Sequence, residues 1–425
     1  MTQLIAALDA LAGEQAGPSD GWLAELRRAG RARFESTGLP TPKMEAWRGT
    51  NVTRLGRIPI VAAKPADAPL HELTRLRLGG PRLVFSGGRL IDSDGASPDG
   101  LWAGTFAEAL DRFGESMRTW LAEDGETGAF EALNQASLGY GAVVVTEDGA
   151  RIDAAVEIVY TMGAQASAAL QQPRTLIVAA PNSSVQVVET FYGEGDTPTL
   201  TNAVSRVLVG ENAAVEHARL QIEGPQAWHV STVNSRQERA SRYAAHHINL
   251  GAVVARHNTR AVLDGEGAHC LLNGLYLVSG NQHVDNSTVL DHAKPHCDSR
   301  EVFKGILAGK ARSVFTGRII VREDAQKTDA KQSNPNLLLS PTALAQTRPQ
   351  LEIYADDVRC THGATVGRMD DEAVFYLRSR GLSETAARNM LIHAVAGEVL
   401  AAIGVAPLRE ALEAAVHARL NALED

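Results

Sequence analysis

A cysteine and a histidine separated by one residue, Cys360 and His362, are the groups in this sequence best suited to bind a metal. They end a strand-like run, and in an extended strand residues i and i+2 project from one face about 6.6 Å apart. Thiolate and imidazole bind iron, zinc and iron–sulfur clusters. Because a closed site needs about four ligands, the pair predicts half of a site that a partner chain completes. Spacing alone also permits a structural role, with Cys360 a small buried apolar residue and His362 a polar turn residue.

A second group of candidate ligands is His283, His292, His296 and Cys297. His292 and His296 have the four-residue spacing of zinc-binding pairs on helices. Pro295 and the extended pattern around it argue against a helix, so that spacing loses its meaning. We therefore interpret the group as polar turn residues or as ladders along stacked strands.

The motifs give little support to nucleotide or hydrolytic chemistry. The run GILAGKARS, 305–313, imitates a phosphate-binding loop, but it is one residue short between its glycines, and Ala311 stands where a hydroxyl residue is needed. We expect no nucleotide site of this type. A solenoid lyase or hydrolase acting on carbohydrate would need convergent carboxylates, and the adjacent Asp356 and Asp357 would point to opposite faces of a strand.

The pattern along the chain predicts a β-rich centre between helical ends. Residues 1–140 mostly show helical spacing, with a short extended stretch around the turn at Gly87 and Gly88. Residues 141–368 consist of short, β-branched, alternating runs broken by Gly and Asn, which fit either a β-solenoid or a β-sandwich. Turns of similar build near Asn212, Gly267 and Gly309 have unequal spacings and indicate at best a degenerate repeat.

Residues 369–425 form a third unit, in which helical spacing returns. Asp370 and Ser383 are suitable N-caps for its first two helices. The last helix carries a narrow apolar stripe at steps of four residues: Leu408, Leu412, Val416 and Leu420. We expect this stripe to cover either the end of the solenoid or a partner protein.

Composition limits the compartment and the classes of partner. The chain has 41 basic and 50 acidic residues, a net charge of −9, which argues against a nucleic-acid-binding surface. Three cysteines, Cys270, Cys297 and Cys360, include no C-x-x-C pair and disfavour a disulfide framework. The N-terminal residues lack the features of a signal peptide, and no apolar run approaches the roughly 20 residues of a membrane span. We expect a cytoplasmic protein.

Three segments carry a resemblance to a known family: Gln282–Ser340, then DDVRCTHGATVG at Asp356–Gly367, then DDEAVFYLRSRGLSETAARNMLIHA at Asp370–Ala394. They closely resemble the SufB/SufD family of iron–sulfur assembly proteins, and the Cys/His segment is similar to its SufD branch. The resemblance covers about residues 200–405. It is weaker toward the N-terminus, where Leu39–Val52 is similar to a short Pro/Trp/Arg-containing family motif.

The resemblance implies a right-handed parallel β-helix and a non-catalytic scaffold subunit of the cytosolic SufBCD complex. It implies a SufB-like paralogue paired through the end of the β-helix, and a SufC-like ATPase that docks on the C-terminal helices and hydrolyses ATP. His362, with Cys360 as a second ligand, would hold transient iron or a nascent iron–sulfur cluster together with the partner chain. A homodimer in isolation fits the same scheme. The alternatives are a β-solenoid enzyme (lyase, hydrolase or acyltransferase) and a purely structural tether for SufC.

Overall fold

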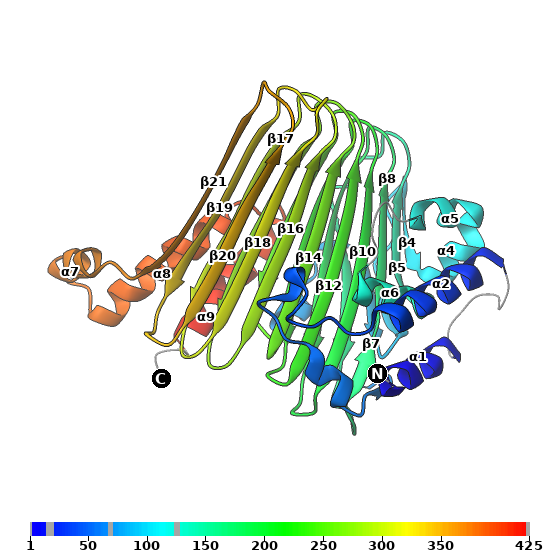
Figure 1. The fold of residues 1–425 in the computed structure, drawn as a ribbon, viewed down its shortest axis with the longest axis horizontal. Helices are drawn as coiled ribbons and strands as arrows, with labels where there is room; N and C mark the ends of the chain where they lie inside the picture. The colour runs from blue at the N-terminus through cyan, green and yellow to red at the C-terminus, as the bar shows by residue number, and fades with distance from the viewer. Residues whose placement is uncertain (1, 14–20, 67–70, 123–127, 422–425) are drawn as a thin grey trace.

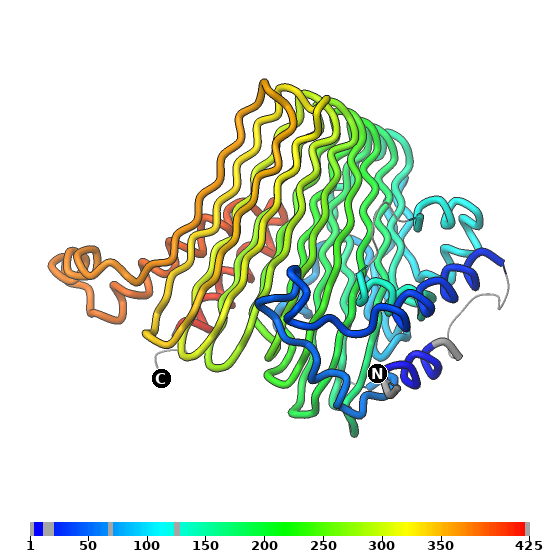
Figure 2. Tube along the Cα trace, in the orientation of Figure 1, coloured from blue at the N-terminus to red at the C-terminus, as the bar shows by residue number. Residues whose placement is uncertain are grey.

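A computed structural model describes residues 2–13, 21–66, 71–122 and 128–421, and most of them form a parallel β-solenoid with helices toward both ends of the chain. Two long sheets run along the molecule, and the chain crosses from one to the other in each coil (Figure 1, Figure 2). The predicted β-helix is therefore confirmed, and the β-sandwich alternative is wrong.

Sheet A, as we call the first sheet, is parallel from β5 onward, with β4 added antiparallel at its start. Its strands in spatial order are β4 (Leu101–Thr105), β5 (Gly141–Thr146), β8 (Arg174–Ala179), β10 (Thr199–Val209), β12 (Ala227–Gln237), β14 (Val254–Leu263), β16 (His283–His292), β18 (Arg312–Val321) and β20 (Leu344–Ile353). Two short strands, β1 (Val61–Ala62) and β7 (Ala169–Gln171), pair beside β10.

Sheet B is the second sheet, and it begins with an antiparallel hairpin of β3 and β2. Gly87 and Gly88 form the predicted turn of this hairpin, both with positive φ. The strands in spatial order are β3 (Arg89–Asp94), β2 (Gly79–Ser86), β6 (Ala155–Met162), β9 (Ser184–Gly193), β11 (Ala214–Glu223), β13 (Arg242–Asn249), β15 (His269–Val278), β17 (Asp298–Leu307), β19 (Asp329–Leu338) and β21 (Arg359–Arg368).

The helices precede or follow the solenoid in sequence. Those before it are α1 (Thr2–Gly13), α2 (Gly21–Thr37), η1 (Glu45–Trp47), η2 (Thr53–Arg57), α3 (Glu72–Arg75), α4 (Phe106–Phe113), α5 (Glu115–Leu121) and α6 (Ala129–Ala136). Those after it are α7 (Asp371–Ser379), α8 (Glu384–Leu400) and α9 (Ala406–Asn421). None of the helices in the described ranges combines the length and apolarity needed to cross a bilayer.

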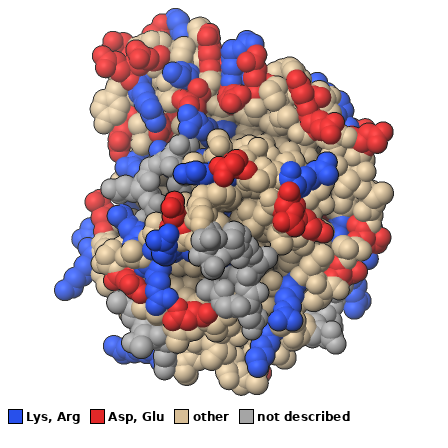
Figure 3. All heavy atoms as spheres, turned by 90° about the vertical axis from the view of Figure 1, so that its right-hand side faces the viewer, with Lys and Arg blue, Asp and Glu red and all other residues tan. Residues whose placement is uncertain are grey.

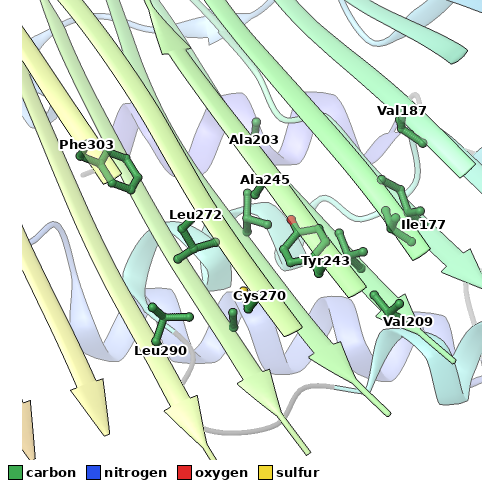
Figure 4. Close-up of a cluster of buried hydrophobic side chains, with 14 of the residues drawn as sticks. Ile177, Val187, Ala203, Val209, Tyr243, Ala245, Cys270, Leu272, Leu290 and Phe303 are labelled. Carbon is green, nitrogen blue, oxygen red and sulfur yellow. The ribbon is translucent and has the colours of Figure 1, made fainter. Parts of the chain in front are cut away.

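Alternation along the strands separates the inside of the solenoid from its flanks. On β17, Ser299, Glu301 and Phe303 share the inward face, while Lys304 and Ile306 point outward to the C-terminal helices. The inward residues of both sheets form one continuous core, part of which is drawn in Figure 4. Each coil therefore buries its apolar face on its neighbours, as stacked repeats require.

The turns explain the unequal spacings seen in the sequence. On one edge of the solenoid, a residue with positive φ recurs about every 30 residues, at Asn182, Asn212, Ala240, Gly267, His296 and Lys327. Gly309 belongs to the opposite edge, where the Lys310 N–H donates to the Gly280 carbonyl at 2.8 Å. Because the three turns singled out in the sequence come from two different ladders, their separations could not be equal.

The helices before the solenoid cover the first coils on the outer face of sheet A. Phe130 and Leu133 of α6 lie against Leu200 and Val230, and α4 and α5 bury Phe106 and Met117 beside β5 and β8. Figure 3 looks onto this end of the molecule, where acidic and basic side chains are interspersed. The outer face of sheet A is thus covered over the first coils.

The C-terminal helices lie along the outer face of sheet B. Asp370 and Ser383 cap α7 and α8 as predicted, accepting hydrogen bonds from Glu372 N–H at 2.9 Å and Ala386 N–H at 3.1 Å. The stripe on α9 is buried within the chain against sheet B: Leu408, Leu412, Val416 and Leu420. The prediction that it covers the end of the solenoid or a partner is therefore wrong, because the flank of sheet B is itself apolar and needed a cover.

Candidate functional site

The candidate ligands lie on the last strand of the solenoid. Cys360 and His362 are both on β21, which pairs in parallel with β19 and forms the free edge of sheet B. In this register Cys360 is beside Ala330 and His362 is beside Gln332, and both of those residues face the interior. The predicted i, i+2 relation holds, so the pair shares the inward face of the last coil.

The two side chains differ in exposure because no coil follows β21. Cys360 is half-buried and lies against the inner core, whereas His362 is exposed. Sheet A ends in the same coil with β20, so each sheet has an open edge there. Ile353, Tyr354 and Val366, with exposed fractions of 40%, 64% and 46%, belong to this coil. The C-terminal end of the solenoid thus exposes the edges of β20 and β21.

Polar groups lie behind His362, and Ala330 lies behind Cys360. Burial raises the pKa of the Cys360 thiol, although the Ala330 backbone N–H partly offsets the effect. Gln332 donates from Nε2 to Oε2 of Glu301 at 2.6 Å, so Glu301, Gln332 and His362 form one column across sheet B. Burial raises the pKa of Glu301 to about 7, with Thr288 and Gln332 opposing the shift. A titratable carboxyl therefore lies two strands behind His362.

Cys360 and His362 remain a pair in this chain. Within the described ranges, no group of three or more His, Cys, Asp or Glu side chains is arranged to hold a metal ion. A thiol and an imidazole supply two ligands, and a tetrahedral or cluster site needs about two more. The geometry is compatible with a shared site at an interface, which the sequence predicts.

The second group of candidates is dispersed. His283 Nε2 contacts Thr50 Oγ1 at 2.8 Å on the outside, and His292 Nε2 contacts Ser299 Oγ at 2.9 Å on the inside. His296 occupies a turn with φ of 58°. Cys297 is buried in the core. These residues do not converge, in agreement with their interpretation as turn and ladder residues.

Sequence reasoning missed a buried charged cluster inside the solenoid. Glu189 Oε2 lies 2.7 Å from His217 Nε2 and 2.8 Å from Arg219 Nε, and all three side chains are buried. Burial opposes ionisation of Glu189, but Arg219 and His217 hold its pKa well below its usual range. The signal was present as inward-facing charges at alternate positions of β9 and β11, which the alternation in that region would have revealed.

Exposed apolar side chains next to the end of the solenoid were also not predicted from the sequence. Phe375 and Tyr376 on α7 and Met390 on α8 have exposed fractions of 73%, 57% and 50%. Helix α7 directly follows β21 and projects away from the body of the molecule (Figure 1). Large exposed apolar side chains on neighbouring helices are typical of protein contacts. We call Phe375, Tyr376 and Met390 the α7–α8 patch.

Comparison with known proteins assigns the family. A family model described as "SUF system FeS cluster assembly, SufBD core domain" matches residues 160–395. The chain belongs to the SufBD family. This SufBD-family chain is 33% identical over 402 residues to the iron–sulfur cluster assembly protein SufD of Escherichia coli K12, which covers 90% of each chain.

Two further relatives extend the similarity over most of the SufBD-family chain. An iron–sulfur cluster assembly SufBD family protein of Synechocystis is 31% identical over 420 residues, 95% of this chain and 92% of the relative. The chloroplastic protein ABCI7 of Arabidopsis thaliana is 27% identical over 396 residues, 89% of this chain and 82% of the relative. The family resemblance stated from the sequence is therefore confirmed.

Proposed function

We propose that this chain is a non-catalytic scaffold subunit for iron–sulfur cluster assembly that works in a complex with a SufB-like paralogue and a SufC-like ATPase in the cytosol. The observation that carries the proposal is the uncapped last coil, where Cys360 and His362 face inward beside two open strand edges. The family assignment supports the assembly role.

The paralogue covers the open end. Unpaired strand edges and exposed apolar side chains promote association, and a solenoid needs a cover over its last repeat. A SufB-like chain that ends in a similar open coil would pair with β20 and β21 and bury Ile353 and Val366. In the absence of that paralogue, a second copy of this chain would occupy the same surface as a homodimer.

The cargo is iron or a nascent cluster held across that interface. His362 supplies an imidazole from this chain, Cys360 supplies a second ligand, and the paralogue supplies the remaining groups. Iron is bound transiently as substrate, so an incomplete ligand set in the single chain suits release as well as capture. This chain would turn over no substrate on its own.

The ATPase docks on the third unit, residues 369–425, through the α7–α8 patch. The apolar stripe of α9 is unavailable for docking, because it is already buried on sheet B. Met369 and Asp370 link β21 directly to α7, so a displacement of α7 on ATP binding would reach the strand that carries both ligands. Division of the chain into 1–140, 141–368 and 369–425 is part of this proposal.

The test uses the complex reconstituted with its paralogue and ATPase. We expect His362→Ala to leave assembly of the complex intact and to lower iron and sulfide bound after reconstitution by about tenfold, because one ligand is removed. His296→Asn is the matched control, since His296 is an exposed turn histidine at positive φ, where Asn is tolerated. Iron and acid-labile sulfide are measured per complex.

Two outcomes would overturn this assignment. If an assembled His362→Ala complex binds normal amounts of iron and sulfide, the chain would be a purely structural tether for the ATPase. Turnover of a carbohydrate or acyl substrate by the purified chain alone would favour a β-solenoid enzyme.

A further inference from the structure

The segment Leu39–Val52, which carries part of the family resemblance, lies across the outer face of sheet A and forms one wall of a groove. Thr50 Oγ1 contacts His283 Nε2 at 2.8 Å and also donates to Asp285. A Cβ on Gly49 would come within 2.7 Å of Val314, so the backbone lies close against β18. The segment is thereby fixed to β16 and β18, and its Trp47 faces Phe130 of α6 with ring centroids 5.5 Å apart.

The groove between this segment, α6 and sheet A has a volume of about 290 Å³ and is rich in arginine. Of the described residues that line it, one is acidic, Glu131, and five are arginines: Arg206, Arg236, Arg256, Arg260 and Arg318. The chain as a whole carries a net charge of −9. Several guanidinium groups lining one groove are suited to bind an anionic ligand.

Four of these arginines, Arg236, Arg256, Arg260 and Arg318, pair with carboxylates that do not line the groove. Arg236 Nε donates to Asp264 at 3.0 Å, and Arg318 Nη1 contacts Glu352 at 3.4 Å. Arg256 bonds to Asp285 and stacks over the Trp47 ring at 4.1 Å. Fixed guanidinium groups lose little conformational entropy when a ligand arrives.

The spacing of the arginines follows from the solenoid. Arg206, Arg260 and Arg318 lie in one row across β10, β14 and β18, with Asn234 between the first two. Alternate strands are about 9.6 Å apart, so the row offers charges along an extended path. The N-terminus of the eight-residue helix α6 lines the same groove and adds the positive end of its dipole.

One carboxylate already lies in the groove. Glu131 Oε1 accepts from Asn234 Nδ2 at 2.7 Å, and Oε2 accepts from the Gly128 N–H at 3.0 Å. The groove therefore already accommodates one carboxylate. Glu131 would compete with an anionic ligand for the same hydrogen-bond donors. Guanidinium forks match phosphate oxygens in pairs, which favours phosphate over carboxylate.

From these observations we infer that the groove binds a small ligand carrying a diphosphate or two adjacent phosphate groups. An extended acidic peptide fits less well, because Trp47, Phe130 and α6 close the groove on two sides. The inference does not rest on the role in cluster assembly. It gives the Leu39–Val52 segment a function as the wall of a ligand site.

Calorimetric titration of the full-length chain with inorganic pyrophosphate tests the inference. We expect saturable binding of one pyrophosphate, about tenfold weaker in Arg260→Gln/Arg318→Gln, and several-fold tighter in Glu131→Gln, which removes the competing charge and keeps the helix cap. Arg312→Gln is the matched control, since Arg312 is on the outer face of β18 and does not line the groove. Citrate and a hexaglutamate peptide separate phosphate from carboxylate ligands.

Two results would support the site. Pyrophosphate binding should weaken as salt is added, and the affinity should fall in the arginine double variant but rise in Glu131→Gln. Absence of saturable pyrophosphate binding at about 1 mM, an equal effect of Arg312→Gln, or stronger binding of the peptide would each overturn it. Thermal unfolding of each variant shows whether it is folded. Should the double variant unfold, the Glu131→Gln titration still decides, because an affinity that stays unchanged contradicts the inference.

Discussion

Single residues inside the solenoid carry charge where apolar packing would be expected. Glu189, His217 and Arg219 form a fully buried cluster, with Ser205 donating to Glu189 at 2.9 Å. The hydrogen bonds that each residue makes depend on the others. Removing one member therefore leaves a buried charge without its partner, which costs more than the pair contributes.

Glu189→Gln tests this cluster. We expect it to lower the free energy of unfolding by about 3–5 kcal/mol, because Arg219 stays charged and buried. Glu211→Gln is the control, since Glu211 forms an exposed pair with Arg239 and its loss should cost less than about 1 kcal/mol. Urea unfolding measures the free energy of unfolding of both variants. A loss below about 1 kcal/mol in each variant would contradict a fully buried charge cluster.

The carboxyl of Glu301 makes stability depend on pH. Its pKa is about 7 in the fold against an ordinary value of 4.5, so the folded state binds the proton more strongly than the unfolded chain. The stability that this provides is complete at acidic pH and is lost as pH rises through about 7. Glu301→Gln should therefore be more stable than the parent chain at about pH 8, by at most about 3 kcal/mol, and nearly equal to it at about pH 5.

Urea unfolding at the two pH values measures this effect. A stability gain of the same size at both pH values would mean that the proton on Glu301 is not responsible. Gln332→Leu is a useful companion variant, because it removes the 2.6 Å hydrogen bond to Glu301 and should raise the pKa of that carboxyl further.

At the scale of elements, the C-terminal helices form a flank of the solenoid. The α9 stripe is buried against sheet B, and Glu216 accepts from the Gly404 N–H at 2.6 Å to hold the link between α8 and α9. A narrow apolar stripe at steps of four residues is thus fully used inside the chain.

Leu412→Asp should detach this flank. The substitution places a charge on a side chain that is 0% exposed and should destabilise the helical unit by at least about 3 kcal/mol. Ala414→Asp, on the exposed side of the same helix, is the control. Limited proteolysis of α8 and α9 measures the detachment, and equal protection of both variants would show that the stripe does not hold the helices.

For the whole molecule, the two ends of the solenoid differ. At the first coil the edge strands β4 and β3 are antiparallel to their neighbours, and α4 and α5 pack beside β5 and β8, whereas the last coil ends in the parallel edge strands β20 and β21. We propose the parallel edges of the last coil as the surface for association. The proposed cargo site lies at that end.

Val366→Lys should block that association. A charge on an exposed position of the edge strand should weaken binding to the SufB-like paralogue by at least about tenfold and leave the stability of the single chain almost unchanged. Leu90→Lys, an exposed position on β3 at the opposite end, is the control. Sedimentation of the mixed chains measures the complex, and equal binding by both variants would place the interface elsewhere.

The sequence alone determined whatever depends on neighbours along one strand or helix. Alternation over 141–368 predicted strands, the i, i+2 spacing placed Cys360 with His362 on one face, and Asp370 and Ser383 marked helix starts. Family motifs then selected the β-helix over a sandwich, a choice that alternation left open.

Only the tertiary structure decided which surfaces meet. Residues in adjacent coils are about 30 positions apart, so the arginine row across β10, β14 and β18 is invisible as a local pattern. Burial of the α9 stripe on sheet B and the unpaired edge of β21 likewise depend on which elements lie beside them in space. Periodicity fixes the face on which a side chain projects, but the stacking of coils determines whether that face meets a neighbour, a groove or solvent.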